Sequence, residues 1–227
     1  ATNAGGLKAV KYGTTRQHVL GLEIVTPEGE VVNLGGKLKK DSTGYGLTQL
    51  IIGSEGTLGV VTKVLLKMVP RSKHVVDLLA VFPSAESAIN IVAKVMQSPI
   101  HPLCVEFMDN KGIRCAEAFL NEKLPHSDKG YYVILSIDGN NEEVLDDQCV
   151  FIDELCTTNG ALEVLVADPV KIWKARKSFG EANRARSLIF SAEDTVVPMS
   201  CIPEVVHKLA ELGAKYGVNI HIAAHAA

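Results

Sequence analysis

Apolar and polar residues alternate in short runs over the first 70 positions, and glycine, proline and charged residues separate the runs. Residues 18–25 and 31–34 flank the turn Pro27-Glu28-Gly29-Glu30, which predicts a β-hairpin. A basic, glycine-rich loop follows over residues 35–46, then a short helix around residues 47–52 and a strand over residues 60–69. The front of the chain is therefore predicted to consist mainly of strands joined by glycine-rich loops.

The pattern changes at Pro70-Arg71-Ser72-Lys73, which we take as the boundary between a first domain, residues 1–70, and a second, residues 71–227. In the second domain, segments with helical periodicity alternate with strand-like apolar runs. Helices are predicted over residues 85–96 (with Ser84 as N-cap), 111–120, 142–156, 170–186 and 203–216. Strands are predicted over residues 75–82, 104–108, 131–137 and 162–166, in a run ending at residues 196–197, and over residues 218–223.

This alternation predicts an α+β fold in which helices cover one face of a sheet. A ferredoxin-like arrangement is the favoured version, because its units are of this size. A parallel, doubly wound sheet is the alternative. It is disfavoured because no predicted helix opens with a glycine-rich phosphate loop.

Composition narrows the classes of partner. The 227 residues are 47% hydrophobic and carry a net charge of −3, so nothing indicates nucleic acid or an anionic membrane surface as partner. The five cysteines lie far apart, which suits reduced thiols in a cytoplasmic protein. The chain starts at Ala1 rather than Met and stops just after a strand-like run, so we expect an internal segment of a longer protein.

The stretch from Gly53 to Thr62 is the strongest local signal for ligand binding. Its three glycines, at positions 53, 56 and 59, let the backbone reach positive φ and approach a ligand closely. The loop leads into a strand, whereas the dinucleotide fingerprint follows a strand and opens a helix. A nucleotide bound here therefore implies a fold other than a Rossmann domain, and an ordinary tight turn accounts for the loop equally well.

Three stretches taken together resemble the FAD-linked 2-hydroxyacid dehydrogenases and oxidases. This family includes the GlcD-type subunit of glycolate oxidase, D-lactate dehydrogenases and D-2-hydroxyglutarate dehydrogenase. The three stretches are Ala1-Thr2-Asn3-Ala4-Gly5-Gly6 with Tyr12-Gly13, Gly53 to Thr62, and His225-Ala226. Three further motifs occur in the family's order: Glu106-Phe107-Met108-Asp109, Trp173-Lys174-Ala175-Arg176 and Glu193-Asp194-Thr195-Val196-Val197-Pro198.

The resemblance implies that residues 1–70 are the back part of an FAD-binding domain of the vanillyl-alcohol-oxidase type. Residues 71–227 would then be a ferredoxin-like α+β cap domain. Backbone N–H groups in glycine turns can bind a pyrophosphate without a side chain in the way. The residues implied to contact FAD are Thr2, Asn3, Gly5, Gly6, Gly13, Glu55, Gly59 and Val61. The family's first phosphate-binding loop is expected before Ala1, so residues 1–227 alone are predicted to retain FAD weakly or not at all.

The resemblance also implies roles for two residues of the second domain. Arg176 would bind the substrate carboxylate through two parallel N–H···O bonds. The alternative places Arg176 on a solvated helix face with Lys171, Lys174 and Lys177. His225 would be a ligand of a zinc, iron or manganese ion that polarises the 2-hydroxyl group. His221 is expected to be a core or surface histidine, and Trp173 a core residue.

The implied activity is FAD-dependent oxidation of a small D-2-hydroxy acid, of the lactate or glycolate type, to the 2-oxo acid. Gly180 stands where D-2-hydroxyglutarate dehydrogenases carry a threonine, which disfavours that larger substrate. Expected electron acceptors are an electron-transfer flavoprotein, an iron–sulfur subunit or a quinone. A homodimer is compatible with the sequence, and the expected location is the cytoplasm or the periphery of the inner membrane. The alternatives are a flavin-using transferase resembling alkyl-dihydroxyacetonephosphate synthase, and a non-catalytic fragment.

Overall fold

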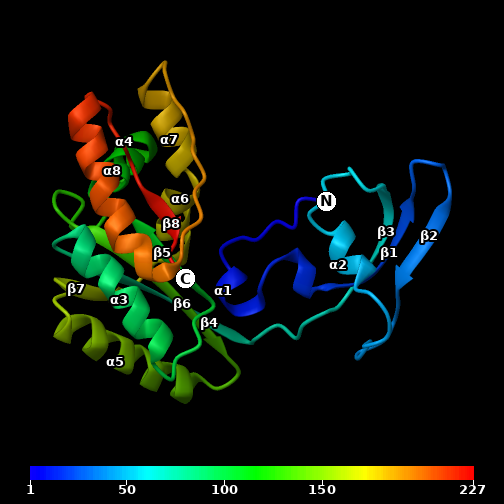
Figure 1. The fold of residues 1–227 in the computed structure, drawn as a ribbon. Helices are drawn as coiled ribbons and strands as arrows, with labels where there is room; N and C mark the ends of the chain where they lie inside the picture. The colour runs from blue at the N-terminus through cyan, green and yellow to red at the C-terminus, as the bar shows by residue number, and fades with distance from the viewer. The chain divides into compact units, whose positions relative to one another are not determined.

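A computed structural model describes residues 1–227 as two compact units, Ala1–Arg71 and Ser72–Ala227 (Figure 1). Each unit has its own sheet and its own apolar core. None of the helices combines the length and the apolar character that a membrane span requires.

The first unit is built on a three-stranded antiparallel sheet in the order β2-β1-β3. Its strands are β1 (Val19–Val25), β2 (Val31–Gly35) and β3 (Val60–Leu66), and the predicted hairpin joins β1 to β2. The short helix α2 (Leu47–Ile51) packs Ile51 against Leu22 and Ile24 of the central strand. Two short elements precede the sheet, the helix α1 (Ala9–Tyr12) and the 3₁₀ turn η1 (Thr15–Gln17).

The second unit is built on a five-stranded sheet in the order β7-β4-β6-β5-β8, with every neighbouring pair antiparallel. The strands are β4 (His74–Phe82), β5 (Cys104–Met108), β6 (Tyr131–Gly139), β7 (Glu163–Val166) and β8 (Ala223–His225). Helix α3 (Ala85–Gln97) connects β4 towards β5, and α5 (Glu142–Thr158) connects β6 to β7. The order β7-β4-β6-β5 with these two helices is the predicted ferredoxin-like arrangement, and β8 extends it at one edge.

Helices cover both faces of this sheet, so the prediction of helices on one face is wrong. Helices α3, α5 and α8 (Ile202–Tyr216) pack on one face. Helices α4 (Asn110–Leu120) and α6 (Pro169–Lys177) pack on the other, beside α7 (Phe179–Arg186). The strand β4 shows the reason, because Leu78, Ala80 and Phe82 join the first core while Leu79 and Val81 join the second. A continuous apolar run of this kind is typical of a strand buried on both faces.

Three local predictions also need correction. The helix predicted over residues 170–186 is two helices, separated at Ser178, whose hydroxyl donates to the Lys174 carbonyl at 2.8 Å. The run ending at residues 196–197 is not a strand, and Val196 is 95% exposed. The last strand begins at Ala223 rather than at residue 218, because the Val218 N–H still bonds to the Gly213 carbonyl as α8 ends at the left-handed Gly217.

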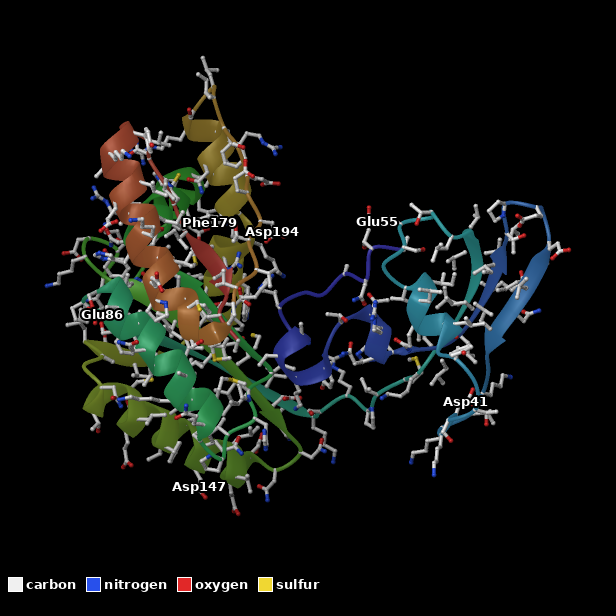
Figure 2. The ribbon with its side chains drawn as sticks, viewed as in Figure 1. Asp41, Glu55, Glu86, Asp147, Phe179 and Asp194 are labelled. Carbon is white, nitrogen blue, oxygen red and sulfur yellow. The ribbon has the colours of Figure 1, made fainter.

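Helix α7 is seated against α4 through a contact that requires glycine at position 112. A Cβ on Gly112 would lie 2.1 Å from Cε2 of Phe179 and 2.8 Å from Oδ1 of Asp109. Figure 2 shows Phe179 at the start of α7. Gly180, one residue further, has no atom within 4 Å of its Cβ position. Two helical glycines of the same unit therefore differ in the space beside them, Gly112 being buried and Gly180 exposed.

We expect Gly112→Ala to lower the free energy of unfolding by about 1–3 kcal/mol, because the methyl group forces Phe179 out of place. Gly180→Ala should be neutral or stabilising by up to about 1 kcal/mol, since alanine favours the helix. Urea denaturation followed by the fluorescence of Trp173, the chain's one tryptophan, reports on this unit. A Gly112→Ala variant as stable as the parent would show that the Phe179 ring is not held against α4.

Candidate functional site

Polar side chains form a row across the five-stranded sheet on the face covered by α6. Asp77 on β4 pairs in register with Ser136 on β6, and Cys104 on β5 pairs with the same serine. Glu106, two residues along β5, pairs in register with His225 on β8. These side chains interrupt the apolar face formed by Leu79, Val81, Met108, Tyr132 and Ile134. We call Asp77, Ser136, Cys104, Glu106 and His225 the polar row.

Glu106 has no exposed surface and is the best-connected member of the polar row. Its Oε2 accepts a hydrogen bond from Nε of Arg176 at 2.9 Å and forms an ion pair with Nη2 of Arg176 at 2.8 Å. Its Oε1 lies 2.7 Å from Nδ1 of His225, and an ionised carboxylate accepts the hydrogen bond there. Burial raises the pKa of Glu106, while the Arg176 charge and the His225 hydrogen bond act in the opposite direction. One carboxylate thus joins β5, α6 and β8.

Arg176 points at the sheet rather than into solvent. Helix α6 starts at an N-cap, Asp168, whose carboxylate accepts from the Val170 N–H at 2.8 Å, and it buries Ile172 and Ala175. Arg176 lies four residues after Ile172, so it shares the buried face, and its side chain is 15% exposed. The alternative of a solvated cationic face is therefore wrong for Arg176. It fits the three lysines of this helix, which are all exposed: Lys171, Lys174 and Lys177.

The guanidinium of Arg176 has two hydrogen-bonding edges, and Glu106 uses one of them. Glu106 occupies the edge formed by Nε and Nη2, and no described contact uses Nη1. The end-on edge, formed by Nη1 and the second hydrogen of Nη2, is the one that could take a ligand carboxylate in two parallel bonds. That Arg176 binds the substrate carboxylate stays a prediction, and the end-on edge is the part of the side chain that would bind it.

The other aromatic and cysteine side chains near the polar row have structural partners. Trp173 packs against the core on the α6 side, and its Nε1 donates to Oδ2 of Asp77 at 2.9 Å. The hydroxyl of Ser136 donates to Oδ1 of Asp77. Burial raises the pKa of the Cys104 thiol to about 11, so it stays protonated near neutral pH. Trp173 is partly buried and packs against the core, close to the core position predicted for it.

The residues present do not make a metal site. Nowhere in the chain do three or more His, Cys, Asp or Glu side chains come together as metal ligands. The carboxylate beside His225 already spends both oxygens on His225 and Arg176. His221 lies before β8 and is half-buried, and burial lowers its pKa, with the charges of Arg186 and Lys111 adding to the effect. His225 as a metal ligand stays a prediction without support from this arrangement.

In the first unit, three segments that are distant in sequence meet around Asn3. The Oδ1 of Asn3 accepts from the Thr14 hydroxyl at 3.0 Å and from the Arg16 N–H at 2.9 Å. The Glu55 N–H donates to the Ala1 carbonyl at 3.2 Å, and Nη2 of Arg16 donates to the Ile52 carbonyl at 2.8 Å. The predicted cofactor residues Thr2, Asn3 and Glu55 are therefore brought together. Glu55 projects from the loop between α2 and β3 (Figure 2).

The glycines near Asn3 differ in their exposure and in the space around their Cβ positions. Gly6, and Gly56 with φ +84°, are exposed, and their Cβ positions have no atom within 4 Å, so a ligand can approach their backbone. Gly5 is also exposed. A Cβ on Gly13 would lie 2.7 Å from the Gln17 side chain, and one on Gly59 would lie 2.9 Å from the Val25 carbonyl. The fold of the unit itself therefore requires glycine at positions 13 and 59.

An anionic group such as a pyrophosphate fits this part of the first unit. Exposed glycine backbone, the left-handed residues Asn3 and Glu55 (φ 54° and 52°) and the cation Arg16 lie on the segments that meet there. Val61, by contrast, packs against the core of the unit. As contacts of FAD, the eight predicted residues stay predictions.

Sequence reasoning gave no role to Glu106, which it named only as part of a family motif, and did not name Arg16. Glu106 is the one charged residue in the otherwise apolar strand Cys104–Met108, and a buried charge needs partners. That pattern could have identified it. Arg16 lies in a polar segment among exposed residues, and nothing in the local pattern marks it.

Comparisons with known proteins agree with both units. A family model described as FAD linked oxidases, C-terminal domain, matches residues 71–227, and one described as FAD binding domain matches residues 1–35. A D-lactate dehydrogenase of Anaerostipes hadrus is 36% identical, covering 100% of this chain and 50% of that protein. The glycolate oxidase subunit GlcD of Bacillus subtilis is 35% identical, covering 99% of this chain and 48% of that protein. The chain thus spans about half the length of the curated relatives it matches.

Solved structures support the fold. An alkyldihydroxyacetonephosphate synthase matches with a TM-score of 0.60 and 20% identity, covering 80% of this chain and 34% of that one. A p-cresol methylhydroxylase matches with a TM-score of 0.54 and 17% identity, covering 73% and 38%. At these identities the likeness shows the fold alone. The predicted α+β fold of the vanillyl-alcohol-oxidase type is confirmed.

Proposed function

Because the chain belongs to the FAD-linked oxidases, we propose that it serves the FAD-dependent oxidation of a small D-2-hydroxy acid, of the lactate or glycolate type, to the 2-oxo acid. The observation that carries this proposal is the similarity, over essentially the whole chain, to relatives named D-lactate dehydrogenase and glycolate oxidase subunit. The structural likeness to alkyldihydroxyacetonephosphate synthase concerns the fold, so it does not favour the transferase alternative.

FAD, when bound, supplies the acceptor for the hydride that leaves C2 of the substrate. The chain's own contribution in the first unit is to hold the cofactor's anionic part. We assign this to the exposed backbone of Gly5, Gly6 and Gly56, with Asn3 and Glu55 beside it. The electrons then pass to an acceptor, for which an electron-transfer flavoprotein, an iron–sulfur subunit and a quinone remain the proposed candidates.

In the second unit, Arg176 is proposed to bind the substrate carboxylate. Its end-on edge offers two parallel N–H donors, and Glu106 occupies the adjacent edge formed by Nε and Nη2, so the guanidinium has one orientation. A carboxylate held in two bonds cannot rotate freely, which fixes the position of C2 relative to the protein. Binding through a planar fork also favours 2-hydroxy acids over simple alcohols, which lack the carboxylate.

The cofactor contact can be tested with two matched glycines. Gly56 (φ +84°) and Gly160 (φ +87°) are both left-handed and both open, so alanine should strain each by about 1–2 kcal/mol. We expect Gly56→Ala, in the full-length holoenzyme, to lower FAD occupancy several-fold, measured from the ratio of flavin to protein absorbance. Gly160→Ala, after α5, should keep the parent's occupancy. Equal occupancy in the two variants would remove Gly56 from the FAD site.

The substrate contact can be tested on helix α6. We expect Arg176→Met to lower kcat/KM for flavin reduction by D-lactate about 100-fold or more, since two charge-assisted hydrogen bonds are lost. The flavin spectrum should be unchanged, and the neighbouring exposed Lys177→Met should behave as the parent. Anaerobic stopped-flow measurement of flavin bleaching gives both rates. Reduction of Arg176→Met at the parent's rate would exclude this assignment, and a parent that no 2-hydroxy acid reduces would exclude the proposed function.

A further inference from the structure

Glu106 is a fully buried carboxylate for which packing alone gives no reason. The other residues of β5, Cys104, Val105, Phe107 and Met108, are apolar and buried. Transfer of a charge into such surroundings is unfavourable, and replacing a buried ion pair by apolar residues is often neutral or stabilising. Stability therefore does not explain a glutamate here, and its contacts do suggest another purpose.

We propose that Glu106 is a positioning residue that orients Arg176 and His225 together towards one substrate. This inference rests on the proposed function and extends it to a residue that does not touch the substrate. Its two oxygens bond to different groups, Oε2 to Arg176 and Oε1 to His225. The carboxylate of Glu106 therefore links Arg176 on α6 to His225 on β8.

The contact with Arg176 sets which edge of the guanidinium is available. Nε donates to Oε2 at 2.9 Å and Nη2 lies 2.8 Å from the same oxygen in the ion pair, so these two contacts hold the guanidinium in one orientation. The arginine side chain has several rotatable bonds. Without this contact they would be free before binding, and binding a carboxylate would then cost rotamer entropy. Glu106 removes that freedom before the substrate arrives, which lowers the entropic cost of binding.

The contact with His225 sets the tautomer of the imidazole. Oε1 of an ionised Glu106 can only accept, so Nδ1 of His225 carries the hydrogen. In the neutral ring Nε2 is then a hydrogen-bond acceptor, and no described contact uses it. The side chain of His225 is 52% exposed. A 2-hydroxy acid carries both groups that these side chains could bind: a carboxylate for Arg176 and a hydroxyl that donates to Nε2 of His225.

Asp77 provides a matched control on the same face of the same sheet. It is also a buried carboxylate with two side-chain partners, Trp173 and Ser136, but neither is a cation and neither is hydrogen-bonded to Arg176 or His225. A general loss of packing should therefore appear in Asp77→Asn as much as in Glu106→Gln. Only loss of positioning should be specific to Glu106.

The test is a double-mutant cycle in the full-length holoenzyme, with Glu106→Gln, Arg176→Met, the double variant and Asp77→Asn. We expect Glu106→Gln to lower kcat/KM for D-lactate about 10- to 100-fold, mainly through KM, with an unchanged flavin spectrum. In the Arg176→Met background the same change should cost several-fold less than in the parent, because the part of its effect that acts through Arg176 is gone and only the part that acts through His225 remains. Asp77→Asn should stay within about threefold of the parent.

Equal losses from Glu106→Gln in the two backgrounds, or an equal loss in Asp77→Asn, would overturn the proposal. If Glu106→Gln does not fold, Glu106→Asp replaces it, because it keeps the charge and withdraws the carboxylate by one methylene. If the parent oxidises no 2-hydroxy acid, the proposed function fails. An Arg176 Nε–H resonance protected from solvent exchange in the full chain and lost in Glu106→Gln then supports the positioning, and an unprotected resonance in the parent overturns it.

Discussion

The candidate site of the second unit depends on one buried carboxylate shared between a guanidinium and an imidazole. Glu106 has no exposed surface, and it joins β5 to α6 through Arg176 and to the edge strand β8 through His225. Electrostatic attraction is strong in such dry surroundings, and so is the penalty for leaving any member unpaired. The three groups therefore hold each other in place, and the position of each depends on the other two.

The fold supplies the dry surroundings. Because helices pack on both faces, the strands carry apolar side chains above and below, and the polar row crosses one of these faces under α6. Asp168 caps the start of α6, Ile172 and Ala175 bury one side of it, and Ser178 ends it. The Phe179 ring then seats the next helix on Gly112. Arg176 reaches the sheet because these contacts fix the rotation of α6 about its axis.

Much of the fold could be predicted from the sequence, because its elements carry strong local signals. The strand over residues 104–108 matches β5 in the structure, and Ser84 caps α3 as predicted. The errors arise where local pattern does not decide. The run Leu78–Phe82 reads as a strand whether one or both faces are covered, and only its unbroken apolar character indicates both. Residues 218–222 contain enough apolar side chains to suggest a strand, but the Val218 N–H still bonds to the Gly213 carbonyl where α8 ends at Gly217.

The sites could be predicted less completely. The resemblance to a known family identified Arg176, Asn3 and Glu55 as candidate site residues. The local sequence pattern alone could not distinguish Arg176 from the exposed lysines around it. The period of α6 separates them, because Arg176 follows the buried Ile172 by four residues while Lys171, Lys174 and Lys177 are exposed. Glu106 was visible as a lone charge in an apolar strand, but its partners come from positions 70 and 119 residues away. A local sequence pattern cannot reveal partners that are so far apart in the chain.

The most direct measurement is a crystal structure of the full-length holoenzyme with a 2-oxo acid product bound. It should show the ligand carboxylate on the Nη1 and Nη2 edge of Arg176, with Glu106 still bonded to Nε of Arg176 and to Nδ1 of His225. A ligand carboxylate bound elsewhere, or an Arg176 that leaves Glu106 to reach the ligand, would contradict the idea that one buried carboxylate holds both groups ready for the substrate.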